Sequence, residues 1–240
     1  MNRPTAVVIG IGPGLGQALV RAFALDGFNV AFVGRRQEAV AEHEAEMRAE
    51  GMAVAGFVGD ASKPDVMDPV FAAIADRFGP AEVLIYNAAT IEPARFTTSP
   101  AIEHVQYGEA AGWDARTEPA DFAYLVDTFR TNVAGAHHAA TRVVPDMIAR
   151  GRGSILLTGG VLAFDPWIEW GVTALGKAAL RSLGHSLFKE LGPHGVQATT
   201  VAIHGTMQAG TAYDHDVIAR AYLDVHKRPQ AEWTPDFHFR

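Results

Sequence analysis

The feature that most constrains the fold of this 240-residue chain is a glycine-rich turn near its start, which joins an apolar run to a helical pattern. The apolar run, residues 5–9, has the composition of a strand buried on both faces, and residues 17–23 have the spacing of an amphipathic helix. The turn between them consists of Gly10, Ile11, Gly12, Pro13, Gly14, Leu15 and Gly16. Backbone N–H groups at a helix N-terminus attract an anion, and glycines let it approach closely. The turn therefore predicts a seat for a nucleotide diphosphate, with an ordinary tight turn as the alternative.

The same alternation of apolar runs and helical patterns continues along the chain and predicts its architecture. Strands are expected at residues 5–9, 29–33, 53–58, 83–86, 154–158 and 196–202, and helices from Gly14 to about 26, from Arg36 to 51, and over 64–78, 121–148, 172–191 and 217–226. Strands that alternate with helices pair in parallel, and the helices cover both faces of the sheet. We therefore predict an α/β fold: a three-layer doubly wound parallel sheet of the Rossmann type, with its ligand site at the carboxyl ends of the strands.

Length and irregular segments predict the domain organisation. A chain of 240 residues fits one α/β domain, so residues 1–240 are expected to form a single dinucleotide-binding unit. Between residues 90 and 119 the alternation lapses into Pro, Thr, Gly and isolated charges, over a length that is unusual for a connection between a strand and a helix. We interpret residues 97–119 as an insertion and residues 207–240, which end in an aromatic cluster, as a short C-terminal extension.

Composition argues against several classes of protein. The net charge of -7 disfavours a nucleic-acid partner or an anionic membrane surface. No apolar window is long enough to span a membrane and the N-terminus lacks the pattern of a signal peptide, so a cytoplasmic location is expected. The absence of cysteine excludes disulfides, thiolate metal sites and thiol nucleophiles. No metal site is expected, because the ten histidines are scattered and the adjacent His137 and His138 point to different faces of a helix.

Several short motifs then occur in a consistent order along the chain. They are Gly10, Gly14 and Gly16 in a Gly-x-x-x-Gly-x-Gly turn, Tyr86-Asn87-Ala88-Ala89, Asn132-Val133-Ala134-Gly135, Lys177 at the start of a helix, and His204-Gly205-Thr206. With these motifs the chain resembles the short-chain dehydrogenase/reductase family over most of its length. The resemblance implies that Asn87, Ala88, Lys177, His204, Gly205 and Thr206 contact a nicotinamide dinucleotide, together with the glycine turn.

The residues after the second strand indicate which dinucleotide is bound. Arg35 and Arg36 stand where a carboxylate would select a free ribose 2′-hydroxyl, whereas a guanidinium suits a 2′-phosphate. We therefore favour NADP over NAD, although both arginines fit a solvated helix start as well. Asp60 and Ala61 follow the third strand, where the resemblance implies contact with the adenine; a helix or turn cap is the alternative for Asp60. Pro13 departs from the family, because it removes one N–H from the phosphate turn.

The catalytic positions depart further from the family. The resemblance implies hydride transfer between the nicotinamide and a carbonyl or alcohol, with a tyrosine as proton donor or acceptor, a lysine four residues later that lowers its pKa, a serine thirteen residues earlier, and an asparagine on the preceding helix. Lys177 and Asn132 occupy their positions in that pattern, but Thr173 replaces the tyrosine and Gly160 replaces the serine. A threonine hydroxyl is a poor acid near neutral pH, and glycine has no side-chain donor.

Other groups could take over the proton transfer. His204, Tyr107 and Thr158 are candidates, and His104 and Glu109 lie in the same irregular segment as Tyr107. Loop histidines and tyrosines more often cap or pack. Trp167 and Trp170 would line an apolar substrate pocket, or else pack against Trp233 and Phe237.

Two functions remain open at this stage. The first is an NADP-dependent oxidoreductase of the short-chain type with an atypical catalytic centre, acting on a small carbonyl or alcohol substrate. The second is an NADP(H)-binding protein that has lost catalysis and works as a sensor or interaction module. The helix over 172–191 has apolar faces wide enough for its own core and for a partner copy, so a homodimer or homotetramer is expected, with burial inside one subunit as the alternative.

Overall fold

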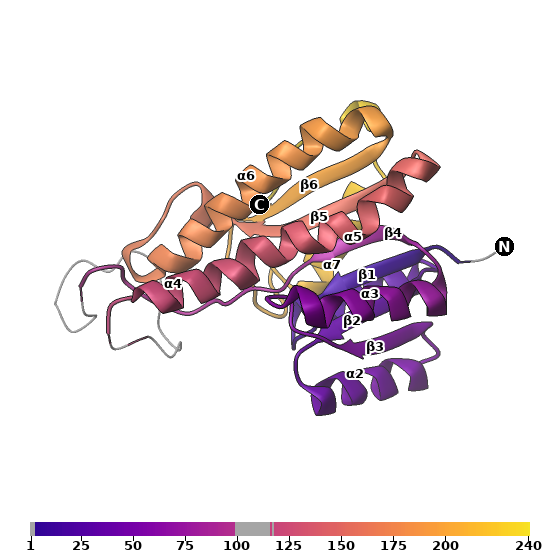
Figure 1. Cartoon of the computed structure of the whole chain (residues 1–240), viewed down its shortest axis with the longest axis horizontal. Coiled ribbons are helices and arrows are strands. Elements are labelled where there is room, and N and C mark those ends of the chain that lie inside the picture. The colour runs from indigo at the N-terminus through magenta and orange to yellow at the C-terminus, as the bar shows by residue number, and fades with distance from the viewer. Residues whose placement is uncertain (1–2, 99–115, 117) are drawn as a thin grey trace.

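The computed structural model of the chain describes residues 3–98, 116 and 118–240, and its centre is a seven-stranded parallel sheet (Figure 1). The strand order is β3-β2-β1-β4-β5-β6-β7, so the chain starts in the middle of the sheet, builds one edge and then crosses over to the other. The strands are β1 (Thr5–Ile9), β2 (Asn29–Gly34), β3 (Val54–Val58), β4 (Ala81–Tyr86), β5 (Gly153–Gly160), β6 (Val196–Ile203) and β7 (Asp236–Phe239). The strand order reverses between β1 and β4, which is the point at which doubly wound sheets bind their ligands at the carboxyl ends of the strands.

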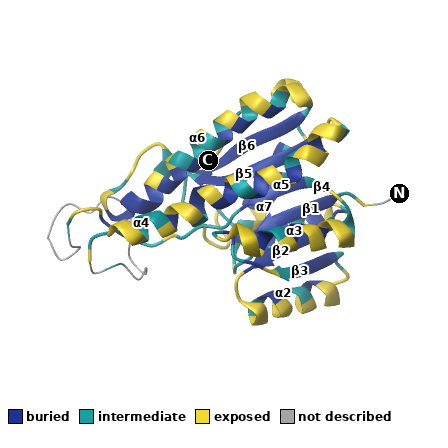
Figure 2. Cartoon of the chain, in the orientation of Figure 1, coloured by how far each residue is buried: buried dark blue, intermediate teal, exposed yellow. Residues whose placement is uncertain are grey.

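Helices cover both faces of the sheet, which confirms the three-layer arrangement (Figure 2). The helices are α1 (Leu15–Leu25), α2 (Gln37–Ala49), α3 (Pro64–Phe78), α4 (Phe122–Phe129), α5 (Gly135–Arg150), α6 (Gly171–Leu191) and α7 (His215–His226). Buried side chains of α1, α2 and α7 pack on one face, and those of α3, α5 and α6 pack on the other.

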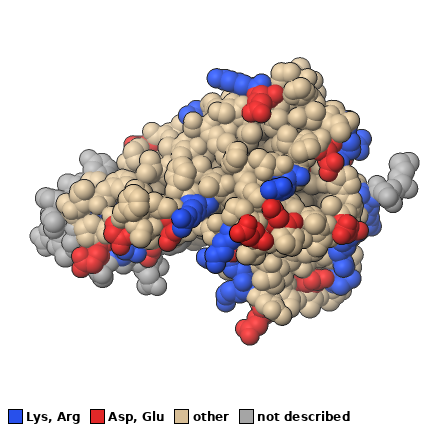
Figure 3. Space-filling view, in the orientation of Figure 1, with Lys and Arg blue, Asp and Glu red and all other residues tan. Residues whose placement is uncertain are grey.

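Strand β1 shows why the sequence folds in this way. All five of its residues are buried; Val7 and Ile9 belong to one apolar layer, and Ala6 and Val8 belong to the other. A strand with helices on both sides has no solvated face, so its sequence is a continuous apolar run without polar alternation. Most charged side chains lie at the periphery, and Figure 3 shows both signs interspersed on the visible face; Arg95, Glu169 and Lys177 are buried.

Two elements differ from the sequence expectation. The helix expected over 121–148 is divided by a π-helical stretch, Arg130–Ala134, between α4 and α5. The stretch is fixed by tertiary contacts, because a Cβ on Gly135 would lie 2.4 Å from the carbonyl oxygen of Ala61, and the Tyr86 hydroxyl donates to the carbonyl oxygen of Thr131. The aromatic end of the chain forms β7, which pairs with β6 and extends the sheet by one strand.

The sequence also predicts an insertion at 97–119 and a C-terminal extension at 207–240. Of the insertion expected at 97–119, residues 99–115 and 117 lie outside the described residues. The segment 207–240 contains α7 and β7, which pack on α1 and pair with β6, respectively. Across residues 3–98, 116 and 118–240, no helix combines the length and the hydropathy that a membrane span requires.

Candidate functional site

The glycine turn brings the end of β1 into direct contact with the end of β4. Gly10 has a φ of 100°, and a Cβ there would lie 2.5 Å from the backbone nitrogen of Ala88. The side chain of Asn87 donates from Nδ2 to the carbonyl oxygen of Gly10 over 2.9 Å. A side chain at Gly10 would force the two segments apart, so the glycine is required by packing as well as by conformation.

The remaining glycines of the turn shape the start of α1. Gly14, at φ 94°, precedes the helix, and a Cβ on Gly16 would lie 2.7 Å from the carbonyl oxygen of Gly10. A Cβ on Gly12, in contrast, would meet nothing within 4 Å. No side chain of the described residues caps the N-terminus of α1, and its first turn holds no acidic residue. The N–H groups of Gln17 and Ala18 donate to the carbonyl oxygens of Gly12 and Gly14, so the N–H groups that precede Gln17 are the ones that can bind an anion.

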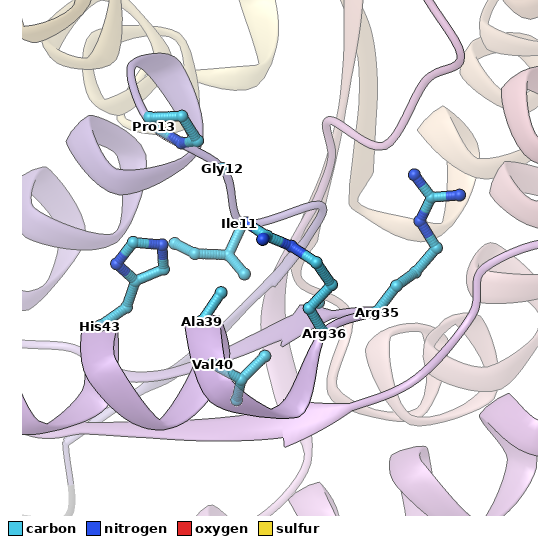
Figure 4. A pocket seen from close by; sticks show the side chains of 9 residues that line it. Ile11, Gly12, Pro13, Arg35, Arg36, Ala39, Val40 and His43 are labelled. Atoms are coloured by element: carbon cyan, nitrogen blue, oxygen red, sulfur yellow. The ribbon is translucent and has the colours of Figure 1, made fainter.

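A cavity of about 430 Å³ adjoins this turn on the side of β2 and α2 (Figure 4). Its lining residues are Ile11, Gly12, Pro13, Gly34, Arg35, Arg36, Ala39, Val40 and His43. Figure 4 shows Arg36 extending toward Ile11. Arg35 and Arg36 are exposed, and the described part of the chain offers neither of them an ion-pair partner. The cavity thus presents two cationic side chains to any ligand that enters it.

His43 belongs to this cavity, although the sequence analysis did not single it out. It lies on α2, two turns beyond Arg36, and its Nδ1 is 3.0 Å from Nε2 of Gln17 on α1. The spacing of residues 36, 39, 40 and 43 on one helix face is the signal that could have identified it.

Asp60 and Ala61 follow β3, as expected, but Asp60 is engaged in its own turn. Its Oδ1 accepts hydrogen bonds from the backbone N–H of Ser62, over 3.0 Å, and from the Ser62 hydroxyl, over 2.7 Å. Partial burial opposes ionisation, but these bonds and the nearby Lys63 keep the pKa of Asp60 below its usual value. The geometry favours the turn-cap interpretation of Asp60, and its contact with a base stays a prediction.

Asn132 and Lys177 occupy neighbouring positions at the other end of the site. Asn132 lies in the π-helical stretch; its Oδ1 accepts from the Thr90 backbone N–H over 2.6 Å and its Nδ2 donates to the Thr90 carbonyl over 3.1 Å. On α6, a Cβ on Gly176 would lie 2.9 Å from the same Nδ2. Asn132 therefore joins the segment after β4 to the helix that carries Lys177.

Lys177 is a buried amine with one hydrogen-bond partner in the described structure. Its exposed fraction is 7%, and its Nζ donates to the carbonyl oxygen of Thr158 over 2.6 Å. Burial lowers the pKa of Lys177 to about 8, because the charged ammonium loses its hydration there. The hydroxyl of Thr158 accepts from the buried Tyr222 hydroxyl over 2.9 Å, so both polar groups of Thr158 are occupied.

Thr173 and Gly160 differ in the space around them. Thr173 has an exposed fraction of only 2%, and its hydroxyl lies 3.5 Å from the carbonyl oxygen of Glu92. Gly160 ends β5 with extended backbone, and among the described residues beyond its chain neighbours a Cβ there would meet only the carbonyl oxygen of Ile203, at 3.6 Å. A side chain could therefore be added at Gly160 without strain, whereas one larger than threonine at position 173 has to displace the segment around Glu92.

Glu92 also binds the phenol of a tyrosine on α4, Tyr124. The Tyr124 hydroxyl donates to Oε2 of Glu92 over 2.7 Å, and the guanidinium carbon of Arg116 lies 4.0 Å from the centre of its ring. Burial, together with the hydrogen bond and the negative charge of Glu92, raises the pKa of Tyr124 to about 12. This phenol thus holds its proton more firmly than an ordinary tyrosine does. The sequence gives no signal for this contact, because Glu92 lies in the irregular segment after β4 and Tyr124 lies on α4, 32 residues later.

His204, Gly205 and Thr206 follow β6. Nε2 of His204 lies 2.8 Å from Nδ1 of His238 on β7, and burial, followed by the charges of His238 and Arg240, lowers the pKa of His204. A Cβ on Gly205 would lie 2.4 Å from the ring of Tyr213, and Thr206 is exposed.

Other predicted candidates contribute less. His104, Tyr107 and Glu109 lie outside the described residues. Trp170 is buried next to Glu169, whose carboxylate accepts from Nε of the buried Arg95 over 2.9 Å. No cluster of three or more metal-ligating side chains occurs in the described part of the chain.

Comparisons with known proteins agree with this geometry. Residues 4–214 match the family model of the short chain dehydrogenases. A Sus scrofa protein, dehydrogenase/reductase SDR family member 4, is 28% identical over 202 residues, which are 84% of this chain and 65% of that protein. A Hericium erinaceus short-chain dehydrogenase/reductase, eriH, is 28% identical over 82% of this chain and 72% of its own length.

Solved structures show the same fold. A metagenomic short-chain oxidoreductase in complex with NADP has a TM-score of 0.80 at 22% identity, over 99% of this chain and 96% of its own. A gluconate 5-dehydrogenase from Burkholderia cenocepacia, in complex with NADP and tartrate, has a TM-score of 0.78 at 19% identity, over 99% and 94%. With a glycine turn after β1, a cavity beside it and a family match over most of its length, the chain belongs to the short-chain dehydrogenase family.

Proposed function

We propose that this chain is an NADP-dependent oxidoreductase that acts on a small carbonyl or alcohol substrate, through a catalytic centre without the usual tyrosine and serine. The observation that carries the proposal is the cavity between the glycine turn and α2, which is lined by Arg35 and Arg36, two cations with no ion-pair partner within residues 3–98, 116 and 118–240. A ribose 2′-phosphate supplies negative charge that balances these two cations, and NAD has no phosphate at that position.

The residues present fit an NADP-type dinucleotide along the whole edge of the sheet. The N–H groups at the start of α1 and the side-chain-free Gly12 fit a diphosphate, and the pair of arginines fits the 2′-phosphate. We assign the other cofactor contacts to the residues after β3, β4 and β6, namely Asp60, Ala61, Asn87, Ala88, His204, Gly205 and Thr206, and to Lys177. Two structural neighbours contain NADP, which supports NADP over NAD.

The chain's own contribution to chemistry is to orient the substrate and to move a proton, whereas the bound nicotinamide supplies or accepts the hydride. Thr173 and Gly160 cannot act as the acid. Lys177 can hold a transferable proton at Nζ, because it is buried, donates to one carbonyl among the described residues and has a pKa of about 8. We assign to Lys177 the proton that passes to the substrate oxygen in reduction, and to Asn132 the positioning of the helix that carries it.

One observation favours a second function, a cofactor-binding sensor without catalysis. The position at which the family has its acid is closed, since Thr173 is buried beneath the Glu92 carbonyl. A buried side chain at the position of the catalytic acid, together with an open cavity for the adenosine, suits a protein that binds NADP(H) and does not turn it over.

A pair of measurements separates the two functions. NADPH is titrated into the protein by fluorescence, and its oxidation is then followed with a panel of aldehydes, ketones and keto acids. The oxidoreductase requires tight binding and turnover with at least one class of carbonyl, together with loss of turnover in Lys177→Met. Binding without turnover across the panel favours the sensor, and failure to bind any nicotinamide dinucleotide overturns both functions.

We further infer that two or four copies assemble through α6. The outer face of this helix carries Leu175, Ala178, Ser182 and Ser186, which are small or apolar and exposed. Such a face lets a second helix approach closely. Light scattering after gel filtration tests the inference, and Leu175→Glu is expected to shift an assembly to monomers.

A further inference from the structure

The imidazole of His215 covers the glycine turn from the side of α7. His215 is the first residue of α7, and α7 packs along α1. A Cβ built on Gly14 would lie 2.7 Å from Nε2 of His215, 3.0 Å from Cδ2 and 3.1 Å from Cε1. The ring edge that carries Nε2 is therefore the part of this side chain that lies against the turn.

The turn is short of one hydrogen-bond donor. Pro13 has no N–H, and its side chain cannot donate in place of the backbone. No side chain of the described residues caps the start of α1, its first turn has no carboxylate, and the amide of Gln17 in that turn is engaged with His43. An anion at this position would be bound by the remaining N–H groups alone.

His215 has a donor to offer. Among the described residues, its ring makes no hydrogen bond, whereas the neighbouring Asp214 uses its carboxylate to accept from the backbone N–H groups of Gly210 and Asp216, over 2.7 Å and 2.9 Å. These bonds fix the first turn of α7, and with it the backbone of His215. The imidazole is thus held against the turn by its helix while its polar atoms stay free.

We propose that His215 binds the diphosphate of the dinucleotide at the Gly10–Gly16 turn through its Nε2–H, and so replaces the donor that Pro13 removes. The proposal rests on the proposed function, because it requires that a dinucleotide occupies this turn. It assigns a binding role to α7, an element outside the glycine turn and outside the segment after β6. A hydrogen bond to a charged group strengthens binding by about tenfold or more.

Binding to two ligands tests the proposal. NADPH carries the diphosphate and the 2′-phosphate, whereas adenosine 2′-monophosphate carries only the 2′-phosphate. His215→Phe keeps a ring over Gly14 and removes the donor, so we expect about tenfold weaker binding of NADPH and unchanged binding of adenosine 2′-monophosphate, by calorimetric titration. The matched control is His194→Phe, an exposed histidine before β6 at the opposite edge of the sheet, which should leave both affinities unchanged.

The outcomes are distinguishable from those of a purely structural role. Unchanged NADPH binding in His215→Phe, or an equal loss of both ligands, overturns the proposal. If His215→Phe does not fold, His215→Gln and His215→Met are compared instead, since only the glutamine can donate; equal NADPH affinities for these two variants also overturn it. If the wild-type chain binds adenosine 2′-monophosphate and no dinucleotide, or neither ligand, the proposed function fails before any variant is made.

Discussion

The carboxyl ends of the strands form the proposed binding edge, and the two ends of this edge differ in how many of the expected groups they contain. At the β1–β2 end, the glycine turn, the backbone contact with Ala88 and the arginines of the cavity are all in place, and the cavity is open. At the β5–β6 end, Asn132 and Lys177 are held firmly, but Thr173 is buried and Gly160 offers no side chain. Ligand binding at the first end requires a backbone shape and positive charge, whereas the family's chemistry at the second end requires particular hydroxyl groups.

Under the proposed function, this difference implies that cofactor binding and proton transfer are separable. The adenosine end keeps its shape through strand ends and glycines, which the hydrophobic core fixes. The catalytic end depends on single side chains, and substitution there leaves the core intact. Variants at one end should therefore leave the measurements at the other end unchanged.

The largest effect is expected for the double variant Arg35→Ala/Arg36→Ala. Removing both charge-assisted contacts to a 2′-phosphate should weaken NADPH binding by about a hundredfold or more, while NADH binding changes by less than about threefold. Fluorescence titration measures both affinities. Arg152→Ala, at the exposed turn before β5, is the matched control. Equal weakening of NADPH and NADH would remove the arginines from the 2′-phosphate site.

A gain of function should follow when the missing hydroxyls are restored. In Thr173→Tyr combined with Gly160→Ser, we expect carbonyl reduction to rise by about a hundredfold, because general acid catalysis contributes factors of this size. The serine fits without strain, but the phenol has to displace the Glu92 segment from Thr173. Thr173→Phe with Gly160→Ser has the same bulk without the hydroxyl and is the control. NADPH affinity should stay within about twofold in both, and a rise that the phenylalanine variant shares would speak against a restored acid.

The adenosine end is also the part of the molecule that was predictable from sequence. The strand and helix patterns specify the parallel sheet, because continuous apolar runs such as β1 and glycines at the turn are properties of adjacent residues. The carboxyl-edge location of the glycine turn, Arg35 and Arg36 follows from that topology alone. The boundaries shifted by one or two residues at most in β3, β5 and α6.

The rest depends on contacts between distant residues. The π-helical stretch is set by Gly135 against Ala61, and β7 forms because its four residues pair with β6; neither has a local signal. The Glu92–Tyr124 bond and the burial of Thr173 depend on how the chain after β4 returns to α6. The contact of His215 with Gly14 is of the same kind, since it joins the start of α7 to the turn after β1; His43, in contrast, had a local signal in the spacing of α2.

Lys177 should influence stability through its buried amine. Its pKa is lowered to about 8 in the folded state, so between about pH 8 and pH 10 the unfolded chain binds more protons and stability rises with pH. The expected gain over this window is about 2 kcal/mol, measured as the difference in the free energy of unfolding between the wild type and Lys177→Met in urea. Lys189→Met, on the exposed face of α6, should show no such pH dependence. A flat difference across the window would mean that the ammonium is solvated.

The smallest effect is expected at Asn132, and it tests whether the catalytic end is held independently of the adenosine end. Asn132→Ala removes two hydrogen bonds to the Thr90 backbone and leaves a gap beside Gly176, which should lower the free energy of unfolding by about 1.5 kcal/mol. Asn29→Ala, at the amino end of β2, is the control and should change stability by less than about 0.5 kcal/mol. Binding of adenosine 2′-monophosphate should be the same in both variants, because the cavity and the Thr90 contact lie on different strands. Weaker binding of adenosine 2′-monophosphate in Asn132→Ala, but not in Asn29→Ala, would contradict the independence of the two ends. It would show that a change in the segment after β4 reaches the glycine turn through the hydrogen bond from Asn87 to Gly10.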